Sequence, residues 1–179
     1  YRVGRSLVLP SFPTISDISF TPKQKLPGHH IVYEGGLLDP GHFPWEYRNY
    51  LSIFLKLVNE GIHVHAYAAQ KDRSALGTYY RLAERNPYFH LHDTVAYQQL
   101  VIEMSAYTWG LAGFNFEEVT DERKKVFLNN ALPNKLFDYL LAGVCPIVYN
   151  CDTAGEYVTR LDAGYHASSV ADIVSIIRK

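Results

Sequence analysis

Short apolar runs alternate with helical patterns along most of this chain, and this alternation constrains its fold more than any other feature. Each run is bounded by glycine, proline or polar residues and has the length of a buried strand. The predicted strands are residues 31–34, 62–68, 88–92, 106–112, 145–149 and 164–166. Strands separated by helices pair in parallel through right-handed crossovers. We therefore expect an α/β fold, a Rossmann-like doubly wound parallel sheet of about six strands in three α/β/α layers.

The segments between these strands carry apolar residues at helical spacing. The predicted helices are residues 44–60, 74–85, 97–104, 153–161 and 170–177, and a further helix that starts at Pro133. Residues 113–131 lack this pattern, so we expect a long irregular connection there. Residues 1–29 contain one apolar run, at 6–9, and then prolines at positions 10, 13, 22 and 27. This composition predicts an entry strand and an interdomain linker in 1–29, with 30–179 as the domain itself.

The composition argues against several classes of function. The formal net charge is −1, so the chain lacks the basic character of a protein that binds nucleic acid. We expect no transmembrane segment, because no apolar run reaches the roughly 20 residues that cross a bilayer. Cys145 and Cys151 are the only cysteines, which favours a reducing compartment and a cytoplasmic location. The chain begins at Tyr1 and ends in a helical pattern, so we interpret it as a fragment of a longer protein.

The stretch 132–148 is the most informative local motif. Pro133 suits the start of a helix, and Gly143 suits its end immediately before an apolar strand. Asn134, Lys135 and Asp138 lie in the first turn and a half of this helix. A helix start attracts phosphate through its free N–H groups and its dipole. Because residues four apart share a helix face about 6 Å apart along the axis, the pattern predicts a phosphate at the tip and a sugar hydroxyl one turn further in.

Ligands of open parallel sheets bind at the carboxyl ends of the strands. Gly35 and Gly36 directly follow a predicted strand, and they would let the backbone approach a ligand closely. The connection 113–131 and the helix start at Pro133 are expected at the same edge. The glycine-rich patterns of dinucleotide-binding and ATP-binding loops are missing from the sequence, which argues against both ligands. The mixed charges of 117–125 indicate a solvated surface or, at this edge, a lid or acceptor contact.

Histidines on two predicted strands offer a different interpretation. His63 and His65 alternate on one strand, and His90 and His92 do so on the next. If these strands are neighbours, four imidazoles approach one another, and imidazole is a common metal ligand. No carboxylate or thiol at a metal-binding spacing accompanies them, so we expect no metal site. The favoured alternative is that they are strand residues with hydrogen-bond partners beneath helices.

The stretch 133–148 resembles the donor-binding core of GT-B glycosyltransferases, in the retaining branch with a Glu-x7-Glu motif. Asp138 takes the place of the second acid of that motif, and an apolar segment, Gly143 and a strand with Pro146 follow it. Residues 133–139 are especially similar to the subgroup with Pro-Asn-Lys-Leu-Phe-Glu-Tyr. The similarity extends over 30–179 and includes the segments 31–37, 90–100, 155–158 and 164–165.

The resemblance implies the nucleotide-sugar-binding half of a two-domain, hexosyltransferase-like enzyme that transfers a sugar, with retention, to an unknown acceptor. Asp138 would bind the ribose hydroxyls, Asn134 and Lys135 would face the diphosphate, and the backbone at Thr94 and Val95 would meet the base. The implied donor-binding residues are Gly35, Gly36, Arg48, Thr94, Val95, Asn134, Lys135 and Asp138. Neither a metal nor another cofactor is implied. The N-terminal half would supply the acceptor contacts and any peripheral membrane association, so the isolated fragment is expected to be inactive.

The sequence departs from the family pattern at two places. Asn130 occupies the position of the first acid, eight residues before Asp138. The basic pair that follows the first glycine loop in many members is also missing, because Leu37 follows Gly36 and Arg48 is the nearest cation. Two alternatives therefore stay open: a nucleotide-sugar epimerase of the same fold, and a non-catalytic nucleotide-sugar-binding module.

Overall fold

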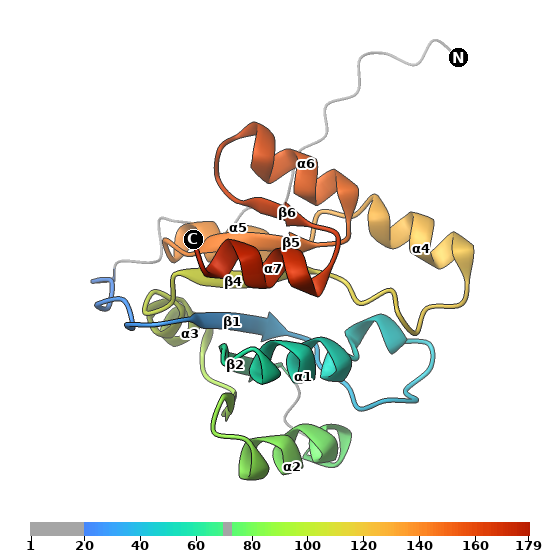
Figure 1. The fold of residues 1–179 in the computed structure, drawn as a ribbon, viewed down its shortest axis with the longest axis horizontal. Helices are drawn as coiled ribbons and strands as arrows, with labels where there is room; N and C mark the ends of the chain where they lie inside the picture. The colour runs from blue at the N-terminus through green and yellow to red at the C-terminus, as the bar shows by residue number, and fades with distance from the viewer. Residues whose placement is uncertain (1–19, 70–72) are drawn as a thin grey trace.

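A computed structural model describes residues 20–69 and 73–179, and it shows one parallel sheet between two layers of helices (Figure 1). The six strands of this sheet pair in the order β3-β2-β1-β4-β5-β6. They are β1 His30–Gly35, β2 His63–Ala68, β3 Phe89–His92, β4 Trp109–Gly113, β5 Cys145–Tyr149 and β6 Tyr165–Ala167. The order reverses between β1 and β4, so the doubly wound α/β fold is confirmed. The predicted entry strand at 6–9 lies outside the described residues.

The helices connect these strands in alternation. They are α1 Leu51–Asn59, α2 Gly77–Arg85, α3 Tyr97–Met104, α4 Glu122–Asn129, α5 Lys135–Leu141, α6 Asp152–Arg160 and α7 Val170–Ile177. Two short 3₁₀ helices, η2 Glu46–Arg48 and η3 Arg73–Leu76, precede α1 and α2. Within the described part of the chain, none of the helices is long and apolar enough to cross a membrane.

The alternation of side chains along each strand produces two separate cores. Ile31 and Tyr33 of β1 point to one face, where they pack with residues of α1, α2 and α7. Val32 points to the other face, where α3, α5 and α6 cover the sheet. Figure 1 shows α1 and α7 on the near side of the sheet and α3 and α5 on the far side. This arrangement is the predicted three-layer α/β/α sandwich.

The predicted helix 44–60 is wrong in its first part. Residues 46–48 form a 3₁₀ turn, and α1 begins only at Leu51. The buried Asn49 separates the two, because its backbone is extended and its side-chain Oδ1 accepts a hydrogen bond from the Leu51 N–H at 3.0 Å. An asparagine that bonds the backbone two residues ahead ends a helix locally.

The irregular connection predicted at 113–131 is also wrong, because it contains α4. The side chain of Asp121 caps this helix by accepting a hydrogen bond from the Arg123 N–H at 2.9 Å. Helical periodicity does not reveal α4, since only Leu128 is buried while Val126 and Phe127 face solvent.

The predicted start of β4 is also wrong. This strand begins at Trp109 rather than at residue 106, because the chain is still turning out of α3 at Ala106 and Tyr107.

Candidate functional site

A cleft of about 590 Å³ opens at the carboxyl end of β1, where the strand order reverses. Its walls come from the loop after β1, from α4 and from the start of α5. Six of the eight residues that the sequence indicated line this cleft: Gly35, Gly36, Arg48, Asn134, Lys135 and Asp138. The topology of the sheet therefore gathers residues that lie up to about a hundred positions apart in the sequence.

A smaller pocket of about 200 Å³ contains the other two indicated residues, Thr94 and Val95. It shares Glu34, Gly35 and Ala69 with the larger cleft, so the two cavities adjoin. The Thr94 hydroxyl donates a hydrogen bond to the carbonyl of Ala68 at 3.0 Å, which fixes the loop after β3 beside the end of β2. The remaining lining residues of this side pocket are mostly aromatic or aliphatic.

The helix that follows Pro133 begins two residues later than predicted. Asn134 is the N-cap residue, its side chain makes no capping hydrogen bond, and Lys135 is the first residue of α5. Pro133 belongs to the turn before the helix, where its carbonyl accepts a hydrogen bond from the Leu136 N–H at 3.0 Å. The side chains of Asn134, Lys135 and Asp138 nevertheless all line the cleft.

Lys135 lies over two aromatic rings, next to the turn formed by Gly35 and Gly36. Its Nζ lies 3.8 Å from the ring centre of Tyr33 and 5.6 Å from that of Tyr50, which are cation–π distances. Burial lowers the pKa of Lys135 to about 8, while the nearby carboxylate of Glu34 opposes this shift. The cleft thus holds a poorly solvated ammonium group whose charged form an anionic ligand would stabilise.

Gly35 and Gly36 each lie against a cationic side chain. Gly35 has a φ of +119°, and a Cβ there would lie 3.5 Å from Lys135 Nζ. A Cβ on Gly36 would lie 3.1 Å from Cδ and Nη1 of Arg48, whose guanidinium is 4.7 Å from the ring centre of Trp45. The glycine turn is therefore flanked by Lys135 on one side and by Arg48 on the other.

Two carboxylates face these cations. Asp138 Oδ1 accepts a hydrogen bond from the Tyr97 hydroxyl at 2.5 Å. Burial raises the pKa of Asp138, and the Tyr97 hydrogen bond opposes that shift. Burial also raises the pKa of Glu34, with Lys135 opposing and Asp138 reinforcing the shift. Opposite charges thus share one partly dry cleft.

Sequence reasoning missed several residues of this site. Glu34 ends the apolar run of β1, and a charged residue in that place was the available signal. Tyr97 opens α3 and reaches the aspartate through tertiary packing, which no local pattern reports. Aromatic side chains also line the large cleft, namely Tyr33, Tyr47, Tyr50, Phe114 and Phe127.

Asn130, which stands where the family pattern has its first acid, does not line the cleft. It is the exposed C-cap residue of α4, and its side-chain amide donates a hydrogen bond to the Val126 carbonyl at 2.7 Å. The side chain therefore caps its own helix.

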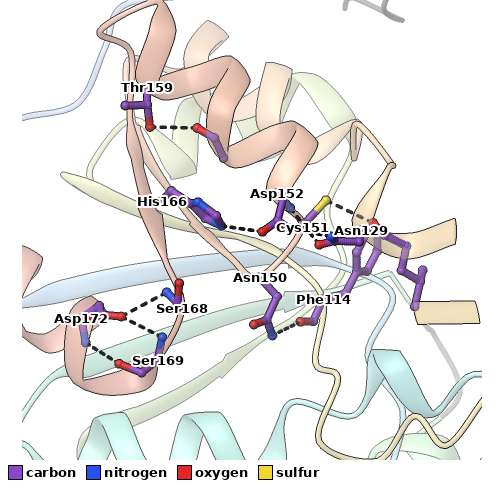
Figure 2. A network of polar contacts seen from close by, with 12 residues as sticks. Phe114, Asn129, Asn150, Cys151, Asp152, Thr159, His166, Ser168, Ser169 and Asp172 are labelled. Carbon is purple, nitrogen blue, oxygen red and sulfur yellow. Dashed lines mark hydrogen bonds and ion pairs between the residues drawn. The ribbon is translucent and has the colours of Figure 1, made fainter. Parts of the chain in front are cut away.

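A polar network joins the end of α4, the segments that follow β4 and β5, and the start of α6 (Figure 2). Asn129 Nδ2 donates to Asp152 Oδ2 at 2.7 Å, and Asn129 Oδ1 accepts from the Asp152 N–H at 2.9 Å, which joins the end of α4 to the start of α6. The buried thiol of Cys151 donates to the Leu128 carbonyl at 3.2 Å. Asn150 Nδ2 donates to the carbonyl of Phe114 at 3.1 Å. Leu128 and Phe114 both line the cleft, so the network positions its side walls.

Another cavity, larger than the cleft at about 760 Å³, lies on α6 and is lined by Thr153, Glu156, Tyr157, Arg160 and His166, among others. Among the residues that the structure describes, it shares none with the cleft or with the side pocket. Its lining includes one carboxylate and one cation, Glu156 and Arg160, whereas the cleft contains two of each. We therefore assign the candidate site to the smaller, charged cleft.

Comparison with known proteins identifies the fold. No protein-family model matches the sequence, and no curated protein matches it. Among solved structures, a chain of the GtfA/B complex, a glycosyltransferase, superimposes with a TM-score of 0.51 and 16% sequence identity. The match covers 88% of this chain and 30% of that chain, so the chain spans less than a third of its neighbour's length. The chain therefore shares the α/β fold of one part of a glycosyltransferase.

Proposed function

We propose that this chain is the nucleotide-sugar-binding domain of a glycosyltransferase, and that the cleft at the end of β1 binds the donor. One observation carries the proposal: Lys135 and Arg48 flank the Gly35-Gly36 turn in the same cleft that contains Asp138. A nucleotide-sugar presents a diphosphate beside a ribose diol, and this cleft offers two cations beside a carboxylate.

The diphosphate would lie against the glycine turn. Lys135 and Arg48 supply charge from both sides, and the absence of Cβ atoms on the glycines lets phosphate oxygens approach the backbone. Partial burial of Lys135 strengthens its attraction to an anion, because the effective dielectric constant is lower than in water. The same cations would stabilise the leaving diphosphate during transfer, a role for which no metal ion is invoked.

The nucleoside would extend from Asp138 into the side pocket. A carboxylate accepts several hydrogen bonds, so Asp138 has capacity for a ribose hydroxyl besides the bond from Tyr97. The base would then meet the loop at Thr94 and Val95, in the side pocket of about 200 Å³. The sugar would face the aromatic wall of the larger cleft, where transfer to an acceptor occurs with retention.

The acceptor contacts would come from the part of the glycosyltransferase that this chain does not represent. The matching region covers 30% of the neighbouring glycosyltransferase chain, which leaves room for a second domain in a protein of that size. We therefore expect sugar transfer only from a protein that also carries the acceptor half.

A second candidate, a non-catalytic nucleotide-sugar-binding module, is favoured by one observation. The resemblance implies an acid at position 130, but the Asn130 side chain caps α4 and does not reach the cleft. Residue 130 therefore supplies no carboxylate to the donor site. This candidate shares the donor site with the first and differs only in turnover.

Calorimetric titration of the chain with UDP, GDP and ADP tests the donor site. The change Asp138→Ala is expected to weaken the preferred nucleotide at least about tenfold, a loss of roughly 1.4 kcal/mol. Glu84→Ala, which removes an exposed carboxylate on α2, serves as the matched control and should leave the affinity unchanged. Failure of every nucleotide to bind, or binding that ignores Asp138→Ala, would contradict the proposal. Turnover of a nucleotide-sugar is then measured with a protein that also carries the acceptor half. Turnover would identify a transferase, and binding without turnover would identify the non-catalytic module.

A further inference from the structure

Five histidines form a continuous row on the face of the sheet that α3 covers. The row, which we call the histidine row, consists of His30 of β1, His63 and His65 of β2, and His90 and His92 of β3. The parallel register places His30 beside His63 and His65 beside His90. The sequence indicated four of these residues, and the pairing of β2 with β3 brings them together as expected. His30 joins them because β2 also pairs with β1.

The imidazoles are hydrogen-bonded to one another. His30 Nδ1 lies 3.0 Å from His65 Nε2, and His65 Nδ1 lies 3.0 Å from His92 Nε2. A separate pair joins His63 Nδ1 to His90 Nε2 at 3.0 Å. The rings also stack across the strands, with centroid distances of 4.3 Å between His65 and His90 and 4.6 Å between His30 and His63. Among the residues that the structure describes, no three histidine, cysteine or acidic side chains are arranged to hold a metal ion.

The capacity of these contacts for protons follows from their chemistry. A neutral imidazole has one donor nitrogen and one acceptor nitrogen, whereas an imidazolium has two donors. His30, His65 and His92 are joined in series by two hydrogen bonds, and both bonds persist with at most one added proton. The single hydrogen bond between His63 and His90 likewise persists with at most one added proton. A third proton must break a bond, and it also places like charges in stacked rings.

The surroundings of the row offer little compensation for added charge. From the segment after α3, the Tyr107 hydroxyl lies 3.1 Å from His65 Nδ1, and Tyr67 of β2 stacks on His92 at 4.3 Å. Within residues 20–69 and 73–179, the other titratable or charged groups around the row are His29, Glu34, Tyr88, Asp93 and Glu103. Asp93 and Glu103 favour protonation of His92, but Glu103 is already bonded to Lys23. Glu34 shares the face of β1 at its far end.

The geometry points to an acid-sensitive switch: we propose that protonation of the histidine row releases the edge strand β3 from β2. β3 is four residues long and, among the strands that the structure describes, pairs with β2 alone, so its attachment depends on few contacts. The row supplies two of the cross-strand side-chain bonds between β2 and β3. The loop at Thr94 and Val95 follows β3 directly, so release of the strand loosens the side pocket as well.

The direction of the pH effect follows from the titration of the row. Burial lowers the pKa of His30, His65, His90 and His92, and neighbouring imidazoles lower each further; for His65 the pKa falls to about 2. Below the ordinary histidine pKa of about 6.5, the protein with β3 released from β2 binds protons that the protein with β3 paired to β2 cannot bind. Each such proton favours release about tenfold per pH unit. The strand is therefore held above about pH 6.5 and loosens as the pH falls below that value.

Hydrogen exchange on the chain between pH 7.5 and 5.0 tests the switch. The ratio of β3 amide exchange to β5 amide exchange cancels the intrinsic pH dependence, and we expect this ratio to rise at least about tenfold on acidification. In the double variant His90→Gln/His92→Gln the rise should be at least about threefold smaller, since two titrating rings are gone. His42→Gln is the matched control, because His42 is exposed in the loop after β1.

Three results would overturn the switch: a ratio that does not change with pH, a double variant that keeps the full rise, or a control that loses it. If the double variant does not fold, NMR titration of the histidine rings in the unchanged chain decides the question. Rings that titrate near their ordinary pKa and independently of one another would contradict the proposal, and mutually dependent titrations below it would support it. Neither readout depends on whether the cleft binds a nucleotide.

Discussion

The cleft and the histidine row are both partly dry polar regions of one sheet, but they combine their charges in opposite ways. The cleft gathers Lys135 and Arg48 with Glu34 and Asp138, and within it Lys135 and Glu34 favour each other's charged form. The row places identical imidazoles against one another, so each proton that one ring gains disfavours the next. A site of mixed charge tolerates ionisation and accepts a charged ligand, whereas a site of identical bases keeps its hydrogen bonds only while few of its rings are charged.

The two regions consequently respond to acid with opposite sign. The raised pKa values of Glu34 and Asp138 mean that the folded state binds more protons than the unfolded state, so their contribution to stability grows as the pH falls toward their ordinary values. The lowered pKa values of the histidines act in the reverse direction at a higher pH. The following four changes break or sharpen this contrast, in order of expected size.

Lys135→Met should have the largest effect, because it removes the poorly solvated cation of the cleft while keeping an unbranched side chain of most of its length. We expect nucleotide affinity to fall about 100-fold, or about 2.7 kcal/mol, in calorimetry. Without the opposing lysine, the pKa of Glu34 should rise further, so stability should increase more steeply on acidification. Lys56→Met, at an exposed ion pair with Glu117, is the control and should leave affinity unchanged. An unchanged affinity in Lys135→Met would remove this lysine from the donor site.

His65→Leu attacks the centre of the row. It should lower the free energy of unfolding at pH 8 by about 2 kcal/mol, because partners on three sides lose a hydrogen bond inside the fold. Those partners are His30, His92 and Tyr107. Urea unfolding at pH 8 and pH 5.5 measures the effect, and the difference from the unchanged chain should shrink at the lower pH. A difference that grows at pH 5.5 would mean that the row does not oppose protonation.

Tyr97→Phe removes one hydrogen bond to Asp138 and keeps the aromatic ring. We expect nucleotide affinity to fall by about 1 kcal/mol, since a hydrogen bond to a charged group is lost. The pKa of Asp138 should rise, because this bond holds it down. Carboxyl carbon NMR of Asp138 against pH measures the shift, and Tyr88→Phe is the control outside the cleft. A lower pKa of Asp138 in the variant would contradict the assigned role.

Phe127→Ala should have the smallest effect on stability, within about 0.5 kcal/mol, because this residue is 73% exposed. Thermal unfolding measures this quantity. In the proposed donor site the same change alters one wall of the cleft, so calorimetry should show weaker binding of the nucleotide-sugar than of the matching nucleoside diphosphate. Equal losses for both ligands would place Phe127 away from the sugar.

The sequence predicted what local signals determine. The six strands, the helices other than α4 and the collection of Gly35, Lys135 and Asp138 at one edge all follow from periodicity and from the topology of parallel sheets. The start of α1 was mispredicted because Asn49 is held by distant contacts, including a hydrogen bond from Asn115 to its carbonyl at 2.6 Å. Tertiary contacts of this kind override local propensity.

The histidine row and the cleft show the same division. The sequence placed two histidines on each of two strands, but the bonds between them depend on the register of β1, β2 and β3, which is a property of the whole sheet. Glu34 and Tyr97 were missed as site residues because their roles come from neighbours about a hundred and about forty positions away. α4 was missed because it buries little of its own surface.

The attachment of α4 has a consequence for how the cleft can change. The helix is fixed by hydrogen bonds at its end and by one buried leucine, while Val126 and Phe127 contribute little to the core. Substitutions on its exposed face therefore cost the fold about 0.5 kcal/mol or less each. Selection, natural or in the laboratory, can vary this wall of the cleft without first acquiring compensating mutations elsewhere. We expect libraries that randomise these two positions to retain folded proteins at high frequency.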